Sequence, residues 1–475
     1  MWGNGAVRMA GYSELFRRAD YAWWVFGDST LALSSSLAIA NSMLLVDVSG
    51  EPALAGLLVG VINSCGLLAA FLGGGLADRR SRRKIIGWCM NFAAVAELVL
   101  AGVLIGMEFL HLGANEGPAP VGALVAFVVL LLCTTFAVDF SSPAEDAALK
   151  NIVTPAEFPR AMSLATGRSN VLSIAGSPLA GALYALHPAA VYFVRSGGFA
   201  GMVLALRNIK RHLGPREVPP AREDLPTPQE PSAHEDSAEF GPDVADDLPP
   251  DSKNARESVP GRGTNPRAPR SRHGFGGFVF LSSNPVLRRI AIAAPLINLA
   301  LFLAMQTTVF AGRSGGQSTL TIGIIYAGFA IGGLAGSFVA PKITDTFPIG
   351  RVVLWGLNGM ALALLAFSFA VGNPWAMFAL GAVAMLPSAA VNGGLFGYVF
   401  AVTPESLQGR VQAAFLVIAG LGNVLAAPLA GGIVAVGSAW LLSVAVLLTS
   451  FAAIALLASS PDLRGLARLE DVYES

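Results

Sequence analysis

Long apolar stretches without a charged residue recur along the whole chain, as in ALVAFVVLLLCTTFAV (123–138) and LLSVAVLLTSFAAIALLAS (441–459). A helix needs about 20 predominantly apolar residues to cross roughly 30 Å of hydrocarbon. The 475 residues are 54% hydrophobic and only 13% charged, which leaves too few polar side chains for a soluble protein of this size. Membrane-spanning strands would alternate apolar and polar residues, and these stretches do not. The sequence therefore predicts an all-α membrane protein.

Twelve segments are expected to be transmembrane helices, near 22–46, 52–76, 85–110, 120–140, 164–186, 189–207, 289–311, 319–341, 352–371, 374–398, 411–435 and 438–459. Lys and Arg gather before the first segment and in every second connection. The alternate connections, such as DVSGEP (47–52) and VGNP (371–374), are nearly free of cations, with Arg313 as the exception. Because cytoplasmic connections carry the excess of Lys and Arg, we expect a multi-pass protein of the cell membrane with both termini in the cytoplasm.

Residues 208–277 differ in composition from the rest of the chain. An acidic stretch ending in DVADDLPPD (243–251) is followed by a basic one, SKNARESVPGRGTNPRAPRSRHG (252–274). A segment with so few aliphatic residues cannot bury enough apolar surface to fold alone. We expect a disordered cytoplasmic linker that acts as a spacer or as a regulatory, phosphorylated segment. It separates an N-terminal bundle (1–207) from a C-terminal bundle (278–475).

The two bundles repeat each other in sequence. An offset of 267 residues aligns identical residues of the two halves, namely Gly56 with Gly323, Gly66 with Gly333, Phe71 with Phe338, Asp78 with Asp345, Trp88 with Trp355 and Asn91 with Asn358. Further along, an offset of 250 aligns SPLAGALYAL (177–186) with APLAGGIVAV (427–436). Duplicated bundles in the same orientation are typical of alternating-access transporters. We therefore expect two pseudo-symmetric bundles of six helices.

A cationic cluster, GGGLADRRSRRK (73–84), lies between the second and third expected spans. It resembles the signature G-x-L-A-D-R-x-G-R-R/K of the major facilitator superfamily, with Ser81 in place of the second glycine, through Gly74, Leu76, Ala77, Asp78, Arg79, Arg82 and Arg83. The resemblance extends over the chain outside the linker. In addition, GFVFLSSNPVLRRIAI (277–292) is similar to the short helix before the seventh span in the branch of proton antiporters that export drugs, macrolides and siderophores.

The resemblance implies that the cationic cluster is a reversible cytoplasmic gate as well as an orientation signal. Gly74 would let the spans at 52–76 and 411–435 approach closely, and Asp78 would accept hydrogen bonds from the start of a facing helix. Arg82 is expected to pair with Asp139, at the cytoplasmic end of the fourth span. The expected gate comprises Gly74, Asp78, Arg79, Arg82, Arg83, Asp139 and Asp345.

Two proline–glycine elements resemble the G-P-x-x-G-G motif of antiporters in this family. The first-half element is partial and has Pro178 and Gly181, whereas the second-half element keeps Pro428, Gly431 and Gly432. The intramembrane arginine that the family carries in its fourth span is absent from LLLCTTFAVDF (130–140).

Few ionisable residues lie inside the expected spans, where they are costly and mark functional sites. Asp28 has no cation near it in sequence, so we expect it either to carry the exchanged proton or to be a structural acid. Glu97 and Arg195 would face each other on two peripheral helices of the family's fold. They are expected to form a structural ion pair, with Glu97 as the second candidate for proton coupling.

In the fold that the resemblance implies, spans one, four, seven and ten line the substrate cavity. Gln306 and Asn392 are candidates to hydrogen-bond a substrate there, and Phe302 and Phe396 are candidates to stack on it. For each of the four, helix packing is the alternative role.

These features favour a secondary transporter that exports an amphipathic small organic molecule, such as a drug, secondary metabolite or siderophore, in exchange for protons. An importer or symporter on the same fold is the alternative and would predict more cavity charges; a sensor or scaffold would need a folded appendage. The sequence has no G-x-x-x-x-G-K-[ST] loop for ATP, and we expect neither an enzyme nor a cofactor. Its 3 cysteines lie in apolar runs and indicate no disulfide or metal site. The expected partners of a monomer are the substrate, protons and lipid, without nucleic acid.

Overall fold

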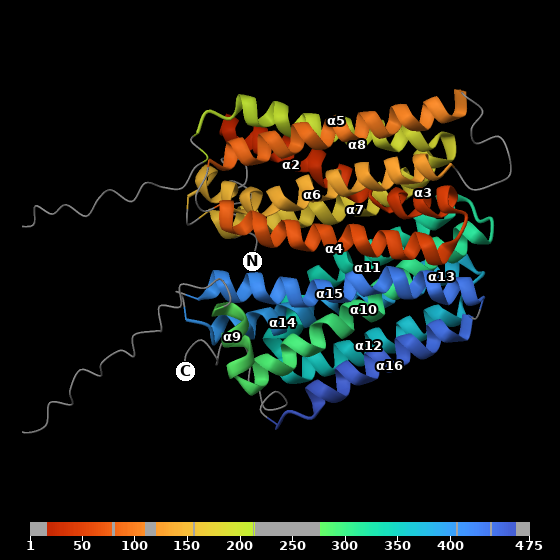
Figure 1. Ribbon diagram of the computed structural model, residues 1–475. Helices are drawn as coiled ribbons and strands as arrows, with labels where there is room; N and C mark the ends of the chain where they lie inside the picture. Colours follow the sequence, from red (N-terminus) through yellow and green to blue (C-terminus); the bar gives the residue numbers. More distant parts are fainter. Residues whose placement is uncertain are drawn as a thin grey trace, which may run out of the picture. The chain divides into compact units, whose positions relative to one another are not determined.

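The computed structural model describes residues 17–77, 81–109, 120–154, 157–211, 213, 276–404, 407–437 and 439–461. These ranges are helical and contain no strand, which confirms the all-α class (Figure 1). Eleven segments within them are long and apolar enough to cross a membrane. The linker expected at 208–277 lies almost wholly outside the described residues. Below, the first half means the described residues up to 213, and the second half those from 276 onward.

The first-half helices follow most of the expected ranges: α2 (Ala19–Ser36), α3 (Ile39–Ser49), α4 (Pro52–Ala77), α5 (Arg82–Phe109), α6 (Val121–Ile152), α7 (Phe158–Leu186) and α8 (Pro188–Asn208). Two differences affect the site. The first expected span is divided into α2 and α3 by a turn at Leu37 and Ala38. In addition, α6 continues to Ile152, well past the end expected at residue 140, because Pro143 is accommodated inside the helix.

The second-half helices are α9 (Gly276–Ser283), α10 (Pro285–Ser314), α11 (Thr319–Thr346), α12 (Ile349–Phe369), α13 (Pro374–Met385), α14 (Ser388–Ala401), α15 (Gln408–Val436) and α16 (Ala439–Ala458). The short helix expected before the seventh span is present as α9 and begins two residues before the expected boundary at 278. The tenth expected span is divided into α13 and α14 at Leu386 and Pro387, since proline has no N–H to continue the helical ladder.

Helix α7 covers the fifth expected span but is not among the eleven apolar segments. Serine, asparagine and glycine residues dilute its aliphatic side chains, and Arg168 lies inside it. Small residues of this kind suit a helix that packs closely on another helix rather than on lipid. The expected number of twelve spans is therefore not supported by composition alone.

Local sequence signals set several helix ends. Gly50 ends α3 with φ of 70°, and Gly437 ends α15 with φ of 69°, a backbone conformation that glycine adopts without a steric penalty. Asn284 caps α10 by accepting hydrogen bonds from the N–H groups of Val286 and Leu287, and Pro285 occupies the first helical position.

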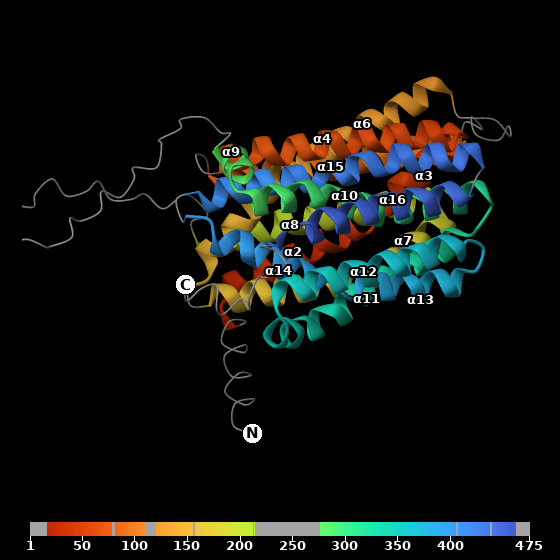
Figure 2. The same ribbon diagram turned by 90° about the horizontal axis from the view of Figure 1, so that it is seen from below.

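The two halves meet along two helix pairs, α4 with α15 and α7 with α11. The first pair lies side by side in both ribbon views (Figures 1 and 2). At the start of α4, a Cβ on Gly56 would overlap the carbonyl oxygen of Ala427 on α15. At the start of α11, a Cβ on Gly323 would overlap the carbonyl oxygen of Ser177 on α7. These contacts are related by the same offsets, 267 and 250, that align the two halves in sequence.

A second pair of glycines obeys the same relation. A Cβ on Gly431 would overlap the carbonyl oxygen of Pro52, and a Cβ on Gly181 would overlap the carbonyl oxygen of Thr319. Pro52 and Thr319 are again separated by 267 residues, and Gly181 and Gly431 by 250. The sequence repeat is thus a structural repeat, and glycines let the backbones of opposite halves touch.

Large apolar side chains divide between the interior and the outer surface. Phe127 and Tyr192 in the first half, and Phe310 and Phe367 in the second, are almost fully buried. Others, such as Trp88, Phe109, Phe338, Trp355, Trp440 and Phe451, are exposed. An outer surface of this kind suits a chain surrounded by lipid, where the hydrophobic effect does not penalise exposed apolar side chains.

The contact at Gly431 leads to a test of the interface between the halves. Gly431→Ala would press a methyl group against the backbone of α4, so α4 and α15 must separate. Because overpacking costs about 1–3 kcal/mol, we expect a lower midpoint of thermal unfolding in detergent. The control is Gly432→Ala, because a Cβ there meets nothing within 4 Å, and it should unfold at the same or a higher temperature. An equal loss in both variants would contradict the contact.

Candidate functional site

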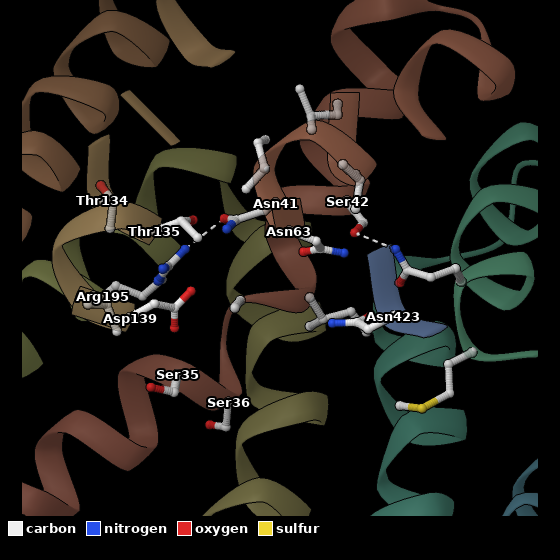
Figure 3. A pocket seen from close by; sticks show the side chains of 18 of the residues that line it. Ser35, Ser36, Asn41, Ser42, Asn63, Thr134, Thr135, Asp139, Arg195 and Asn423 are labelled. Carbon is white, nitrogen blue, oxygen red and sulfur yellow. Dashed lines mark hydrogen bonds between the residues drawn. The ribbon is translucent and has the colours of Figure 1, made fainter. Parts of the chain in front are cut away.

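A cavity of about 390 Å³ lies between the two halves, within the unit that contains both of them. Nine of the helices described above contribute to its wall, and half of the lining side chains are polar but uncharged (Figure 3). The polar residues are Ser35, Ser36, Asn41, Ser42, Asn63, Thr134, Thr135, Asp139, Ser177, Arg195, Gln306, Tyr326 and Asn423. Such a wall offers many hydrogen-bonding groups and few charges to a bound molecule.

The break between α2 and α3 explains part of this wall. Ser35 and Ser36 end α2, and Asn41 and Ser42 lie in the first turn of α3, so two polar residues on each side of the turn line the cavity. Ser and Asn favour such interruptions because their side chains bond to nearby backbone groups. A continuous helix over 22–46 would have pointed some of these side chains away from the cavity.

Two of the four expected substrate contacts line the cavity. Gln306 and Phe302, both on α10, are part of the wall, and the Nε2 of Gln306 donates to the Oγ of Ser42 at 3.4 Å. Tyr326 donates from its hydroxyl to the Oε1 of Gln306 at 3.3 Å and to the carbonyl oxygen of Met305 at 2.9 Å. The hydrogen bond from Gln306 joins the two halves across the cavity.

The other two expected contacts are not part of this cavity. Asn392 is exposed and Phe396 packs on Phe415 with 4.8 Å between ring centroids. The expectation failed because the tenth span is broken, and α11 and α15 supply Tyr326 and Asn423 in its place. The position of Asn423, an amide inside an apolar run, was a sequence signal for a cavity residue. No sequence signal pointed to Tyr326.

Glu97 on α5 and Arg195 on α8 form the ion pair that the sequence predicted. The Nη2 of Arg195 lies 3.0 Å from the Oε1 of Glu97, and both side chains are buried. The geometry is not that of a hydrogen bond, so neither carboxylate oxygen of Glu97 accepts one within the described residues. Arg195 also donates from Nη1 to the Oδ1 of Asn41 at 2.6 Å and lines the cavity, which makes it more central than the peripheral position expected.

Asp28 is not the isolated acid that its sequence neighbourhood indicated. Its carboxylate pairs with the guanidinium of Arg168 on α7. Arg168 lies in α7, which begins at Phe158 and packs beside α2. The two residues are 140 positions apart, which is why no local pattern could reveal the pair.

The expected gate is only partly described, since Asp78 and Arg79 lie outside the described residues. Arg82 donates from Nη1 to the Oδ1 of Asn151 at 2.5 Å and to the carbonyl oxygen of Ala147 at 3.2 Å. The expected pair between Arg82 and Asp139 is therefore wrong in this structure. Both acceptors lie in the last two turns of α6. These turns extend beyond residue 140, where the sequence predicted that the span would end.

The remaining gate residues also bind within their own half or are exposed. Arg83 donates to the carbonyl oxygens of Ile209 and Arg211, which ties the start of α5 to the segment after α8. A Cβ on Gly74 would meet nothing within 4 Å, so the close approach of α4 to α15 occurs at Gly56 and not at the signature. Asp345 is exposed in α11.

Asp139 lies inside α6 and faces the cavity, rather than ending its helix as expected. Within the described residues its carboxylate accepts no hydrogen bond and enters no ion pair, in contrast to Asp28 and Glu97. The close-up places Asp139 beside the cavity with Arg195 and Thr135 (Figure 3).

A second polar cluster joins the halves at the opposite end of the helices from Arg82. Arg313, at the end of α10, donates from Nε to Oδ1 of Asp47 at 2.9 Å and from Nη2 to Oδ2 at 2.7 Å. Tyr184 on α7 donates to the same Oδ2 at 2.7 Å, and the guanidinium lies 5.8 Å from its ring centroid. The one cation that broke the loop pattern therefore belongs to a contact between the two halves.

At the end that carries Arg82, Arg18 binds Glu157 through two hydrogen bonds of 2.9 Å. The pKa of Glu157 is lowered, mainly by hydrogen bonds from the N–H and hydroxyl groups of Thr154 and to a smaller extent by Arg18. This contact lies within the first half and connects the start of α2 to the start of α7.

Comparisons with known proteins show which proteins this chain resembles. A profile described as "Major Facilitator Superfamily" matches residues 26–318. The enterobactin exporter EntS, from Escherichia coli O1:K1 / APEC and from strain S88 of O45:K1, is 25% identical over 171 residues, which are 34% of this chain and 38% of the relative. The chain thus matches well under half the length of these relatives.

Solved structures of similar fold cover almost the whole chain. A bacterial homologue of the iron transporter ferroportin in an inward-facing state has a TM-score of 0.62 and 14% identity, over 94% of this chain and 99% of its own. The nucleoside transporter NupG has a TM-score of 0.58 and 12% identity, over 96% and 100%. At identities this low, the similarity shows a shared fold and nothing about the substrate.

The profile match covers more than half of the chain and spans the first bundle and the start of the second. The repeated bundles, their paired glycines and the cavity between them agree with it. The chain belongs to the Major Facilitator Superfamily.

Proposed function

We propose that the protein is a secondary transporter that works by alternating access and exports an amphipathic small organic molecule in exchange for protons. The observation that carries the proposal is the cavity between two repeated halves, with a polar contact joining the halves at one end. Export is supported by the similarity to the enterobactin exporter. The combination of polar wall residues with Phe302, Met305 and Phe199 suits an amphipathic molecule.

In this proposal the end with Arg82 faces the cytoplasm, as the distribution of Lys and Arg favours, and the protein works as a monomer in the cell membrane. The contact between Asp47 and Arg313 then closes the outer side, and the described arrangement is an inward-facing one. The signature that contains Asp78, Arg82 and Arg83 would close the cytoplasmic side in the outward-facing state, with Asp345 at the equivalent position of the second half. The proline–glycine elements at Pro178 and Pro428 lie on the helices that must move against the opposite half.

An importer or symporter of a polar solute is the second candidate. The similarity of fold to the nucleoside transporter NupG is compatible with it, although a likeness at 12% identity does not identify a substrate. A metal ion is less well supported as cargo, because the described residues contain no group of three His, Cys, Asp or Glu side chains placed to hold one.

Proton exchange is tested in inverted membrane vesicles that carry the protein. Respiration acidifies their interior, and quenching of an acridine dye reports the pH gradient. We expect that adding a transported compound, drawn from a macrolide, a catecholate siderophore and an organic cation, releases protons and partly restores dye fluorescence. Vesicles without the protein are the control. Accumulation of a nucleoside in whole cells, with no dye response to any compound, would favour the importer.

The contact at the outer end predicts a change in cavity access. Asp47→Asn removes an ion pair that contributes about 1 kcal/mol, so the outer end should open several times more often. A cysteine placed at Ser42 in the cavity wall, in a variant without native cysteines, should then react faster with an impermeant thiol reagent added outside.

The matched control for Asp47→Asn is Glu51→Gln, which removes an exposed acid from the same connection. It should leave the labelling rate unchanged. Exchanging the two charges, with Asp47→Arg and Arg313→Asp together, should return labelling toward the rate of the parent. Unchanged labelling in Asp47→Asn would show that the contact does not hold the outer end closed.

The buried pair on α5 and α8 predicts a loss of stability rather than a simple loss of coupling. Glu97→Gln leaves the guanidinium of Arg195 buried without its counter-ion, and breaking such a pair costs about 3–5 kcal/mol. We expect a lower unfolding midpoint in detergent, and recovery when Arg195→Met is added. Asp345→Asn, which removes an exposed acid from α11, is the control. Normal stability of Glu97→Gln together with loss of the proton response would instead assign the coupling role to Glu97.

A further inference from the structure

The carboxylates of Asp28, Glu97 and Asp139 lie inside first-half helices, and their surroundings differ. Asp28 faces Arg168, and Glu97 faces Arg195. Asp139 has neither an ion-pair partner nor a hydrogen-bond donor within the described residues. An ionisable group that is deprived of water and unpaired is costly, and such groups persist where they act on a ligand or a proton.

The packing of Asp139 shows that its position is built into the fold. A Cβ on Gly66 of α4 would overlap the Oδ2 of Asp139 and would lie 3.0 Å from the methyl group of Thr135. Glycine at position 66 therefore leaves room for the carboxylate in its present place between α4 and α6. The same residue is one of those that the sequence repeat aligns, yet the counterpart Gly333 meets only Met385 within 4 Å. The space for an acid is therefore specific to the first half.

The charges of the cavity wall do not cancel. Asp139 and Arg195 are the two charged residues that line it. The positive charge of Arg195 is offset by Glu97, which lies 3.0 Å from it and outside the wall. One negative charge, on Asp139, remains without compensation in a cavity of otherwise neutral polar and apolar groups.

We propose that Asp139 binds the cationic group of the transported molecule, so that the substrate class is an amphipathic organic cation, and that a proton occupies the same carboxylate in the substrate-free exchange step. This inference rests on the proposed transport function. The carboxylate supplies the charge, the serine, threonine and asparagine side chains bind polar groups, and Phe302 offers an aromatic surface to a cation or an apolar ring. An anionic molecule would meet an uncompensated negative charge.

The binding of a cation and of a proton at one carboxylate makes the two compete. The other titratable or charged groups near Asp139 are Cys65 on the facing α4, Glu145 on its own helix and Arg195 beside it in the cavity wall (Figure 3). Of these, Glu145 accepts a hydrogen bond from Ser141 and does not line the cavity. Lowering the pH protonates the carboxylate and removes the charge that a cation requires, so cation binding must weaken toward acid pH.

The test uses the full-length protein in detergent and two probes of almost the same shape and opposite charge, tetraphenylphosphonium and tetraphenylborate. We expect the cation to bind and the anion to bind weakly or not at all. Binding of the cation should weaken by up to about tenfold per pH unit as the pH is lowered. Asp139→Asn should weaken it by about tenfold or more and remove the pH dependence.

Two further variants separate charge from structure. Asp139→Glu keeps the charge and should retain cation binding with its pH dependence. Asp146→Asn removes an exposed acid from the same helix without touching the cavity, and should bind like the parent. If Asp139→Asn does not fold, the preference for cation over anion and its pH dependence in the parent protein and in Asp139→Glu still decide the matter.

Equal binding of both probes, or cation binding that does not change with pH, would overturn the proposal. Undiminished cation binding in Asp139→Asn would overturn it as well. None of these results would contradict proton-coupled transport in vesicles, because that measurement does not depend on the charge of the substrate. A failure of transport with cation-selective, pH-dependent binding intact would instead contradict the proposed function alone.

Discussion

The cost of an unpaired charge in a low-dielectric interior governs the arrangement of this protein. Removing an ion from water costs several kcal/mol even after the protein relaxes, so each carboxylate inside the helices needs a cation, a donor or a wet cavity. Asp28 and Glu97 satisfy the requirement with arginines contributed by α7 and α8. These pairs also fix which helices of the first half are neighbours. Within the described residues, Asp139 has neither a cation partner nor a hydrogen-bond donor, and its carboxylate lies at the cavity.

The contacts between the halves are of a different kind. They include glycines against carbonyl oxygens, buried apolar side chains, the hydrogen bond between Gln306 and Ser42, and one partly exposed ion pair between Asp47 and Arg313. Backbone surfaces that touch through glycine have no interlocking side chains, and an exposed ion pair contributes only about 1 kcal/mol. Strong pairing inside each half and weak pairing between them allow the halves to move as units, which alternating access requires.

Patterns that act within a short stretch of sequence predicted most of the fold. The apolar runs and the duplicated residues gave the helix class and the repeat, and the predicted pair between Glu97 and Arg195 is present. That pair was expected from the family resemblance, whereas the pair between Asp28 and Arg168 was missed, because no local pattern encodes that these two residues lie side by side. Helix ends were the other weak point: α6 continues through Pro143, and spans one and ten are broken. For this reason Asp139 was assigned to a gate, and Asn392 and Phe396 to a cavity that they do not line.

The two halves repeat each other in their helix contacts, but the charged residues of the cavity lie in one half. The glycine contacts of the two halves are related by the sequence offsets, but Asp139, the acid that lines the cavity, and the ion-paired acids Asp28 and Glu97 belong to the first half. The cavity residues of the second half are Phe302, Met305, Gln306, Tyr326 and Asn423, and none of them is charged. A motion that brings the halves together at either end therefore changes the surroundings of a charge fixed in the first half by moving neutral groups past it. The affinity of that charge for a cation or a proton can then differ between the two states, and this difference in affinity is what an exchanger needs.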